Sequence, residues 1–85
     1  MTWRLVFTRQ AQKDARKISR AGLKSQTVRL LEILKKDPYR QPYEKLLGDL
    51  IGSYSRRINI QHRLVYQILV DIKTVKIIRL WTHYK

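Results

Sequence analysis

The sequence predicts a small α+β domain, in which an N-terminal strand is followed by a two-helix hairpin and a three-stranded antiparallel meander, with the helices packed on one sheet face. Residues 2–7 and 53–68 alternate between apolar and polar side chains, which is the period of a half-buried strand. Between these segments, apolar residues recur at helical spacing on either side of Gly22. Because 85 residues suffice for one small core, we expect a single domain over residues 1–85.

The first predicted elements are a strand over residues 2–7 and a helix over residues 9–21. The strand has three large apolar residues at alternate positions: Trp3, Leu5 and Phe7. Thr8 is expected to cap the helix, because a threonine hydroxyl can accept a hydrogen bond from an unpaired amide of the first turn. Gly22 is expected to end the helix, since glycine adopts the left-handed conformation found after helix C-termini.

Two faces of this helix differ in character. Its apolar residues lie four and three positions apart and predict a narrow buried stripe, formed by Ala11, Ala15 and Ile18. Another side carries cations that we call the basic stripe: Arg9, Lys13, Arg16, Lys17, Arg20 and Lys24. Only Asp14 offsets these cations. The basic stripe is either an electrostatic contact surface for nucleic acid or an ordinary solvated helix face, and the sequence leaves both open.

The second helix is predicted over residues 24–36, and residues 38–52 are predicted to be an irregular connector. The apolar face of the helix consists of Thr27, Leu30, Leu31 and Leu34, widened by Val28 and Ile33. Asp37 ends the helix because the residue before a proline is disfavoured in the helical region. Prolines and glycines argue against regular structure in the connector. Its apolar residues are expected to pin it to the core: Leu46, Leu47, Leu50 and Ile51.

A β-hairpin is predicted over residues 53–68, and the length of its loop decides which side chains meet. A three-residue loop, residues 59–61, places Arg57 opposite Arg63, whereas a two-residue loop would place a charge in the apolar row. Two like charges directly opposite each other are mildly destabilising, and planar guanidiniums suit a phosphate between them. The alternative is that both arginines are simply solvated on an exposed sheet face.

The last strand is predicted over residues 75–84, after a turn at residues 71–74. A three-residue loop within that turn would pair Arg63 with His83. This register brings Arg57, Arg63 and His83 into one row across three adjacent strands.

The chain is strongly basic, with 19 Lys and Arg against six Asp and Glu and a formal charge of +13. This excess predicts a polyanionic partner, either nucleic acid or an acidic protein. The sequence has no Cys, two His and few carboxylates, so we expect neither disulfides nor a metal site, and no cofactor. No apolar run is long enough to span a membrane, and Arg4 interrupts any signal-peptide core. We therefore expect a cytoplasmic protein.

Two residues able to move protons, Glu44 and His83, flank the predicted arginine pair. Metal-independent RNA cleavage needs a base for the ribose 2′-OH, an acid for the departing 5′-oxygen and positive donors to the phosphoryl oxygens. Glu44, His83 and the arginine pair match these roles in type, and Tyr84 can stack on a base or orient the phosphate. The plainer alternative for Glu44 is a surface salt bridge, and His62 is expected to be structural. Further substrate contacts are expected from Arg57, Arg56, Lys45 and Tyr54.

Three segments carry a resemblance to a known family: Y-E-K-L-L-G-D-L from Tyr43, S-Y-S-R-R-I-N-I-Q-H-R-L-V-Y from Ser53, and W-T-H-Y from Trp81. With the order of elements along the chain, they resemble the Txe/YoeB family of type II toxin–antitoxin toxins, within the wider RelE/ParE superfamily. The resemblance implies a RelE-like fold and a ribosome-dependent endoribonuclease that cuts messenger RNA in the decoding site. It also implies an acidic antitoxin that silences the toxin, and frequent dimerisation.

By matching position, Glu44 resembles the family's general base and His83 its general acid. Arg63 resembles the donor that stabilises the strained phosphate, Tyr84 the substrate-orienting tyrosine and Arg57 a supporting phosphate contact. Two other functions stay open. One is a non-catalytic inhibitor on the same scaffold, of the gyrase-targeting kind, against which the presence of Glu44 with His83 and Tyr84 speaks. The other is a basic nucleic-acid-binding module, whose binding would fall steeply with salt.

Overall fold

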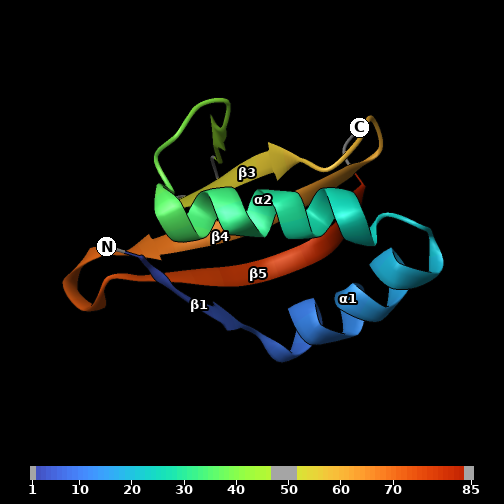
Figure 1. Ribbon diagram of the computed structural model, residues 1–85, viewed down its shortest axis with the longest axis horizontal. Helices are drawn as coiled ribbons and strands as arrows, with labels where there is room; N and C mark the ends of the chain where they lie inside the picture. Colours follow the sequence, from blue (N-terminus) through green and yellow to red (C-terminus); the bar gives the residue numbers. More distant parts are fainter. Residues whose placement is uncertain (1, 47–51, 84–85) are drawn as a thin grey trace.

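The chain folds into a five-stranded sheet with two helices, in a computed structural model that describes residues 2–46 and 52–83, with only the backbone of residues 82 and 83 (Figure 1). The strand order is β1-β5-β4-β3-β2. The elements are β1 Arg4–Phe7, α1 Arg9–Arg20, α2 Lys24–Lys36, β2 Glu44–Lys45, β3 Ser53–Arg57, β4 His62–Leu69 and β5 Thr74–His83. The predicted α+β class is confirmed. In the described ranges, no helix has the length and apolar character needed to cross a bilayer.

One hydrophobic cluster joins both helices to the sheet. Its fully buried residues alternate along the central strands β4 and β5 and are completed by one or two residues from each helix: Leu64, Tyr66, Val75 and Ile77 from the strands, Ala11 and Ile18 from α1, and Leu34 from α2. Because successive side chains of a strand point to opposite faces, the two residues on either side of Leu64 in β4, Arg63 and Val65, lie on the face away from this cluster.

β1 and α1 are tied to β5. β1 runs parallel to β5, with Phe7 opposite Ile77. Thr8 caps α1 as predicted, since its hydroxyl accepts a hydrogen bond of 3.0 Å from the Ala11 amide. The helix gives way to Gly22, whose φ of 74° is in the left-handed region that favours glycine.

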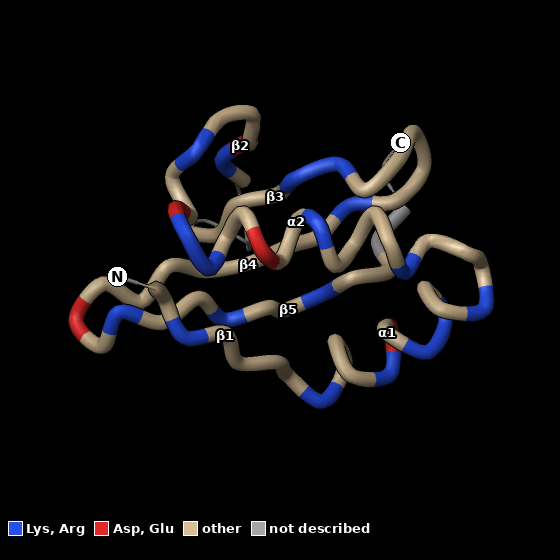
Figure 2. Tube along the Cα trace, viewed as in Figure 1, with Lys and Arg blue, Asp and Glu red and all other residues tan. Residues whose placement is uncertain are grey.

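The buried stripe of α1 differs from the prediction at one position. Ala11 and Ile18 are buried, but Ala15 is exposed and Asp14 is fully buried. Asp14 can lie inside because Arg79 and two backbone amides of β5 donate hydrogen bonds to its carboxylate, which offsets the desolvation of the charge. The basic stripe is exposed along its whole length, and Figure 2 shows Lys and Arg distributed along α1 and over the sheet.

α2 has the predicted bounds and a partly buried apolar face. Leu34 is fully buried and Thr27 is nearly so, whereas Val28 is 44% exposed. The helix ends where predicted because Asp37, which precedes Pro38, adopts an extended conformation with φ −157°.

The connector is less irregular than predicted, because it contains the two-residue strand β2. β2 pairs antiparallel with β3, so that Glu44 lies opposite Ser55. Two residues are too few to show an alternation in the sequence, which is why this fifth strand was not predicted. Leu46 is half-buried. The other residues expected to pin the connector lie outside the described residues: Leu47, Leu50 and Ile51.

The β3–β4 hairpin has the predicted register, with Arg57 opposite Arg63. The Ile58 amide donates to the His62 carbonyl at 2.9 Å and closes the three-residue loop. Within the loop, the Asn59 side-chain oxygen accepts a hydrogen bond of 2.7 Å from the His62 amide, so an asparagine side chain organises this turn. The loop therefore fixes both guanidinium-bearing residues on one face of the sheet.

The register of β4 with β5 differs from the prediction. Arg63 lies opposite Thr82, and the backbone of His83 lies opposite His62. The row that runs through Arg57 and Arg63 is therefore continued on β5 by Thr82 and not by His83. The shift has a physical cause in this stretch of β5, where two backbone amides donate to the buried carboxylate on α1.

The turn between these strands also differs from the prediction. Pairing starts with Leu69 opposite Thr74, so the loop spans residues 70–73 and includes a single turn of 3-10 helix. Two register shifts follow along the strands, one on each side of the pair formed by Val65 and Arg79. The loop lies earlier in the chain than predicted, and the two shifts compensate for most of this difference. The end of β5 is therefore one residue from the predicted register.

Candidate active site

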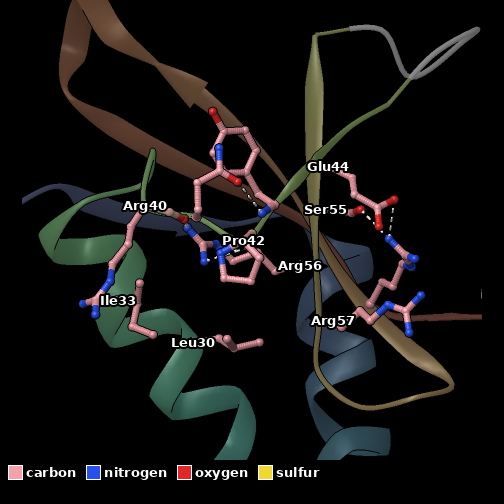
Figure 3. Close-up of a pocket in the computed structure, with 11 residues that line it drawn as sticks. Leu30, Ile33, Arg40, Pro42, Glu44, Ser55, Arg56 and Arg57 are labelled. Carbon is pink, nitrogen blue, oxygen red and sulfur yellow. Dashed lines mark hydrogen bonds and ion pairs between the residues drawn. The ribbon is translucent and has the colours of Figure 1, made fainter.

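Glu44 and Arg63 form an ion pair on what we call the arginine face, the sheet face that carries Glu44, Ser55, Arg57 and Arg63 (Figure 3). Arg63 Nη1 lies 3.0 Å from Glu44 Oε2. The same nitrogen donates a hydrogen bond of 3.1 Å to the Ser55 hydroxyl. Strand pairing explains this meeting, because Glu44 lies opposite Ser55 and Arg63 lies diagonally across from Ser55. Three neighbouring strands thus supply one polar cluster.

The two members of the ion pair differ strongly in exposure. The Arg63 side chain is 5% exposed, whereas the Glu44 side chain is 53% exposed. Arg63 is therefore fixed with its charge largely out of bulk water, while the Glu44 carboxylate faces solvent and can receive a proton from a bound molecule. Arg57 is exposed beside them, opposite Arg63. Two guanidiniums outnumber the single carboxylate, and this excess of positive charge favours binding of a phosphate.

A cavity of about 370 Å³ adjoins the ion pair. Its lining includes the four residues of the arginine face together with Leu30 and Ile33 of α2. Figure 3 shows the α2 residues and the arginine-face residues on opposite sides of β3. The volume is within the ~300–1,000 Å³ range of small-ligand clefts, so the cavity is large enough for part of a nucleotide.

Arg56 lies on the other side of β3 and holds the connector. It is 3% exposed. Its Nε donates to the Tyr66 hydroxyl at 3.2 Å, its Nη1 donates to the Pro42 carbonyl at 3.2 Å, and its Nη2 donates to the Arg40 carbonyl. Figure 3 shows Arg56 turned toward Arg40 and Pro42, away from the ion pair. The structure therefore does not bring Arg56 to the arginine face, but uses it to fix the chain directly before Glu44.

Three tyrosine rings pack beside this guanidinium. The ring centroids of Tyr43 and Tyr54 are 5.4 Å apart, and those of Tyr54 and Tyr66 are 5.8 Å apart. Burial raises the pKa of Tyr66 above its usual 10.0, although the nearby guanidinium opposes the shift, and the protonated hydroxyl donates to the Pro38 carbonyl at 3.4 Å. Tyr54, an expected substrate contact, is half-buried in this stack, and Lys45 is exposed on β2.

The expected acid is located by its backbone alone. β5 places the His83 backbone opposite His62, in the strand that carries Arg63. Tyr84 lies outside the described residues. His62 is buried, and its ring stacks on Trp81 with centroids 4.0 Å apart and planes inclined by 24°, consistent with a structural role. The structure thus brings together the carboxylate and both arginines predicted from sequence.

Sequence reasoning missed three contributors to this arrangement: Ser55, the structural role of Arg56, and Asp14. A signal was present for each. In β3, Ser55 shares the parity of Arg57, and Arg56 shares the parity of the apolar residues. Asp14 lies three and four positions from Ala11 and Ile18 on the buried stripe.

The family model for YoeB-like toxins of bacterial type II toxin–antitoxin systems matches residues 6–84. The chain belongs to this family. It is a toxin of a type II toxin–antitoxin system, and the match includes every strand of the arginine face as well as β5. The comparison with curated proteins found no significant match to this chain.

Solved structures agree with the family. The YoeB/ParE toxin from Agrobacterium tumefaciens is 29% identical with a TM-score of 0.84, and the match covers 95% of this chain and 99% of that chain. The YoeB dimer from Staphylococcus aureus is 32% identical with a TM-score of 0.79, over 96% of this chain and 98% of that chain. The heterotetrameric YoeB–YefM toxin–antitoxin complex from Staphylococcus aureus is 30% identical with a TM-score of 0.79 and the same coverage. The YoeB-like toxin therefore shares its fold with these proteins over nearly all of its length.

Proposed function

We propose that this YoeB-like toxin is a ribosome-dependent endoribonuclease, which cuts messenger RNA by attack of a ribose 2′-OH on the adjacent phosphate. The observation that carries the proposal is the ion pair of Glu44 with Arg63 at 3.0 Å, with Arg57 opposite Arg63 on the same face. This arrangement combines a solvent-facing carboxylate with two cations, as base-catalysed phosphoryl transfer requires, and it adjoins a cavity large enough for part of a nucleotide. Membership of the YoeB-like family supports the same activity.

Glu44 is the general base and His83 is the general acid. The Glu44 carboxylate takes the proton of the 2′-OH, the 2′-oxygen bonds to phosphorus, and the bond from phosphorus to the 5′-oxygen breaks. The departing 5′-oxygen takes a proton from the His83 imidazolium. The upstream fragment then ends in a 2′,3′-cyclic phosphate and the downstream fragment begins with a 5′-hydroxyl. Because histidine titrates near neutrality, the anionic phosphate bound beside it favours the protonated form that an acid needs.

Arg63 and Arg57 stabilise the negative charge that develops on the phosphoryl oxygens. Arg63 is already held by Ser55 and Glu44, so little reorganisation is needed when the charge develops. Proton transfer to Glu44 removes the negative charge that Arg63 faces in the free protein. The attraction between Arg63 and the phosphate therefore strengthens as the transition state forms. Tyr84 would stack on a base or orient the phosphate.

The ribosome and an acidic antitoxin are the proposed partners. The formal charge of +13 favours both kinds of polyanion. The similar Staphylococcus aureus protein is found with YefM in a toxin–antitoxin complex and is also found as a dimer, which supports an antitoxin partner and a homodimer for this chain. Because ribosomes are the site of action, we propose a cytoplasmic location.

Primer extension on messages from cells that express the chain tests the proposal. We expect new 5′ ends within translated messages for the wild type, and loss of these ends with Glu44→Ala and His83→Ala. Glu32→Ala, at an exposed position on α2, is the matched control and should cut like the wild type. Toxicity with intact messages and inhibited DNA supercoiling would contradict the proposal and indicate a gyrase-targeting inhibitor.

A further inference from the structure

α1 holds the end of β5 through hydrogen bonds that the proposed chemistry does not use. The Thr8 hydroxyl donates to the Ile78 carbonyl at 2.8 Å. Asp14 Oδ2 accepts hydrogen bonds from the Leu80 and Trp81 amides at 3.0 and 3.2 Å. Buried backbone groups need partners, and here the helix cap and the first turns of α1 provide them for a stretch of β5.

Asp14 is the centre of these contacts. It is fully buried, and it also accepts hydrogen bonds from Arg79 Nε at 2.8 Å and Gln10 Nε2 at 3.1 Å. Burial by itself would raise the pKa of Asp14, but the hydrogen bonds, with that from Arg79 the largest, outweigh burial and hold the pKa below the usual 3.8. A buried carboxylate with four donors is fixed in place, and it fixes the strand that donates to it.

The contacts coincide with the two register shifts between β4 and β5. The second shift lies between the pair Val65–Arg79 and the pair Arg63–Thr82, so β5 has one more residue than β4 in this interval. Both amides that donate to Asp14 belong to this interval. A bulge re-aims the residues that follow it, and a slip of one residue moves every later side chain to the other face. Thr8 and Asp14, which hold the bulged stretch by hydrogen bonds, therefore help to determine the face to which each side chain at the end of β5 points.

We propose that Asp14 is a positioning residue for RNA cutting: it holds the bulged stretch of β5 and so sets the register in which Thr82 meets Arg63 and His83 follows. The inference rests on the proposed function, in which His83 is the acid. Asp14 is buried on α1 and contacts β5, not the arginine face, so it acts through the strand and not on the substrate. Misplacing a reacting group by about 1 Å can cost ~100-fold in rate.

Asp14→Asn, Thr8→Val and the control Glu32→Gln test the inference. Asp14→Asn keeps the volume of the side chain and removes its charge. Thr8→Val removes the other link to the bulge together with the side-chain cap of α1, and it carries the test if Asp14→Asn does not fold. The rate of cutting of ribosome-bound message is measured and divided by the concentration of folded protein. We expect kcat to fall about 10–100-fold in Asp14→Asn and about 3–10-fold in Thr8→Val. KM should stay within about threefold of the wild-type value. Glu32→Gln should match the wild type.

Nuclear magnetic resonance on the same samples measures the register itself. We expect the backbone contact of Arg63 with Thr82 to be lost in Asp14→Asn and weakened in Thr8→Val, while the contact of Arg57 with Arg63 is retained. An Arg63–Thr82 contact unchanged in the folded variants, or rates that follow only the folded fraction, would overturn the inference. A wild-type chain that cuts no message would refute the proposed nuclease and with it the catalytic part of the inference, and the resonance data would still decide whether Asp14 sets the register.

Discussion

Replacing Arg63 with lysine is expected to slow RNA cutting strongly while it changes the stability of the fold only a little. One guanidinium nitrogen serves both Glu44 at 3.0 Å and Ser55 at 3.1 Å. Lysine keeps the charge but loses the planar fork that matches phosphate. Loss of one preorganised donor to a developing oxyanion costs about 2.7–4 kcal/mol in the free energy of the transition state, which is ~10²–10³ in rate. We expect Arg63→Lys to slow cutting by that factor.

The expected effect of Arg63→Lys on folding is much smaller. Because the Glu44 side chain is 53% exposed, the ion pair contributes about 0–1 kcal/mol to the free energy of unfolding. The hydrogen bond to Ser55 contributes about 1 kcal/mol. A total loss of about 1–2 kcal/mol leaves a domain of ordinary stability, ~5–15 kcal/mol, almost entirely folded.

Two measurements on the same variants test this separation. Single-turnover cutting of ribosome-bound message gives the rate, and urea unfolding gives the free energy of unfolding. Arg29→Lys, at an exposed position on α2, is the control and should change neither quantity. The reasoning is refuted if Arg63→Lys cuts within threefold of the wild-type rate, or if its rate loss equals its loss of folded protein.

Two further predictions concern stability. Arg56→Met removes a buried guanidinium that donates to three oxygens, so we expect urea unfolding to show a loss of about 2–4 kcal/mol. Arg57→Met at the next, exposed position should cost less than about 0.5 kcal/mol, and equal losses would show that Arg56 does not hold the connector. The free energy of unfolding should also fall as the pH drops below about 4, because the pKa of Asp14 in the fold lies below its unfolded value. The stabilisation that Asp14 contributes is fully present when the pH is above the pKa of Asp14 in the unfolded chain, and it is lost as the pH falls through the pKa of Asp14 in the folded protein. Asp14→Asn should reduce the dependence of the free energy of unfolding on pH below about pH 4, and an identical dependence would contradict the assignment.

The β3–β4 hairpin could be predicted because its determinants are local in sequence. The alternation of polar and apolar residues and the position of Arg57 and Arg63 exclude the wrong loop length, because a slip would put a charge in the apolar row. The helices were predicted for the same reason, since the cap at Thr8 and the stop before Pro38 are signals within a few residues.

The end of β5 could not be predicted from local pattern, because its register depends on a residue far away in the chain. The amides of Leu80 and Trp81 donate to Asp14, which precedes them by 66 and 67 residues. Nothing in the alternation of β5 itself reveals a partner on α1. Asp14 was assigned only as an offset to the basic stripe, although its spacing from Ala11 and Ile18 places it on the buried stripe of the helix.

The residue types of the candidate site could be predicted from the sequence, but the residues that hold the site in place could not. Glu44 and Arg63 were selected by type and by the family motif, and the structure brings them into contact. Arg56 was expected to contact the substrate together with Arg57. In a strand, however, adjacent residues point to opposite faces, and burial makes Arg56 a structural donor to the connector.

The central claim, that a ribose 2′-OH attacks the adjacent phosphate when the message is cut, is tested most directly with a chemically altered message. Once primer extension has located a cut site, a synthetic message with a single 2′-deoxy nucleotide immediately upstream of that site is loaded onto ribosomes with the wild-type toxin. We predict that the unaltered message is cut to leave a 2′,3′-cyclic phosphate, and that the 2′-deoxy message stays intact at that site. Cutting of the 2′-deoxy message there at a comparable rate would contradict the claim.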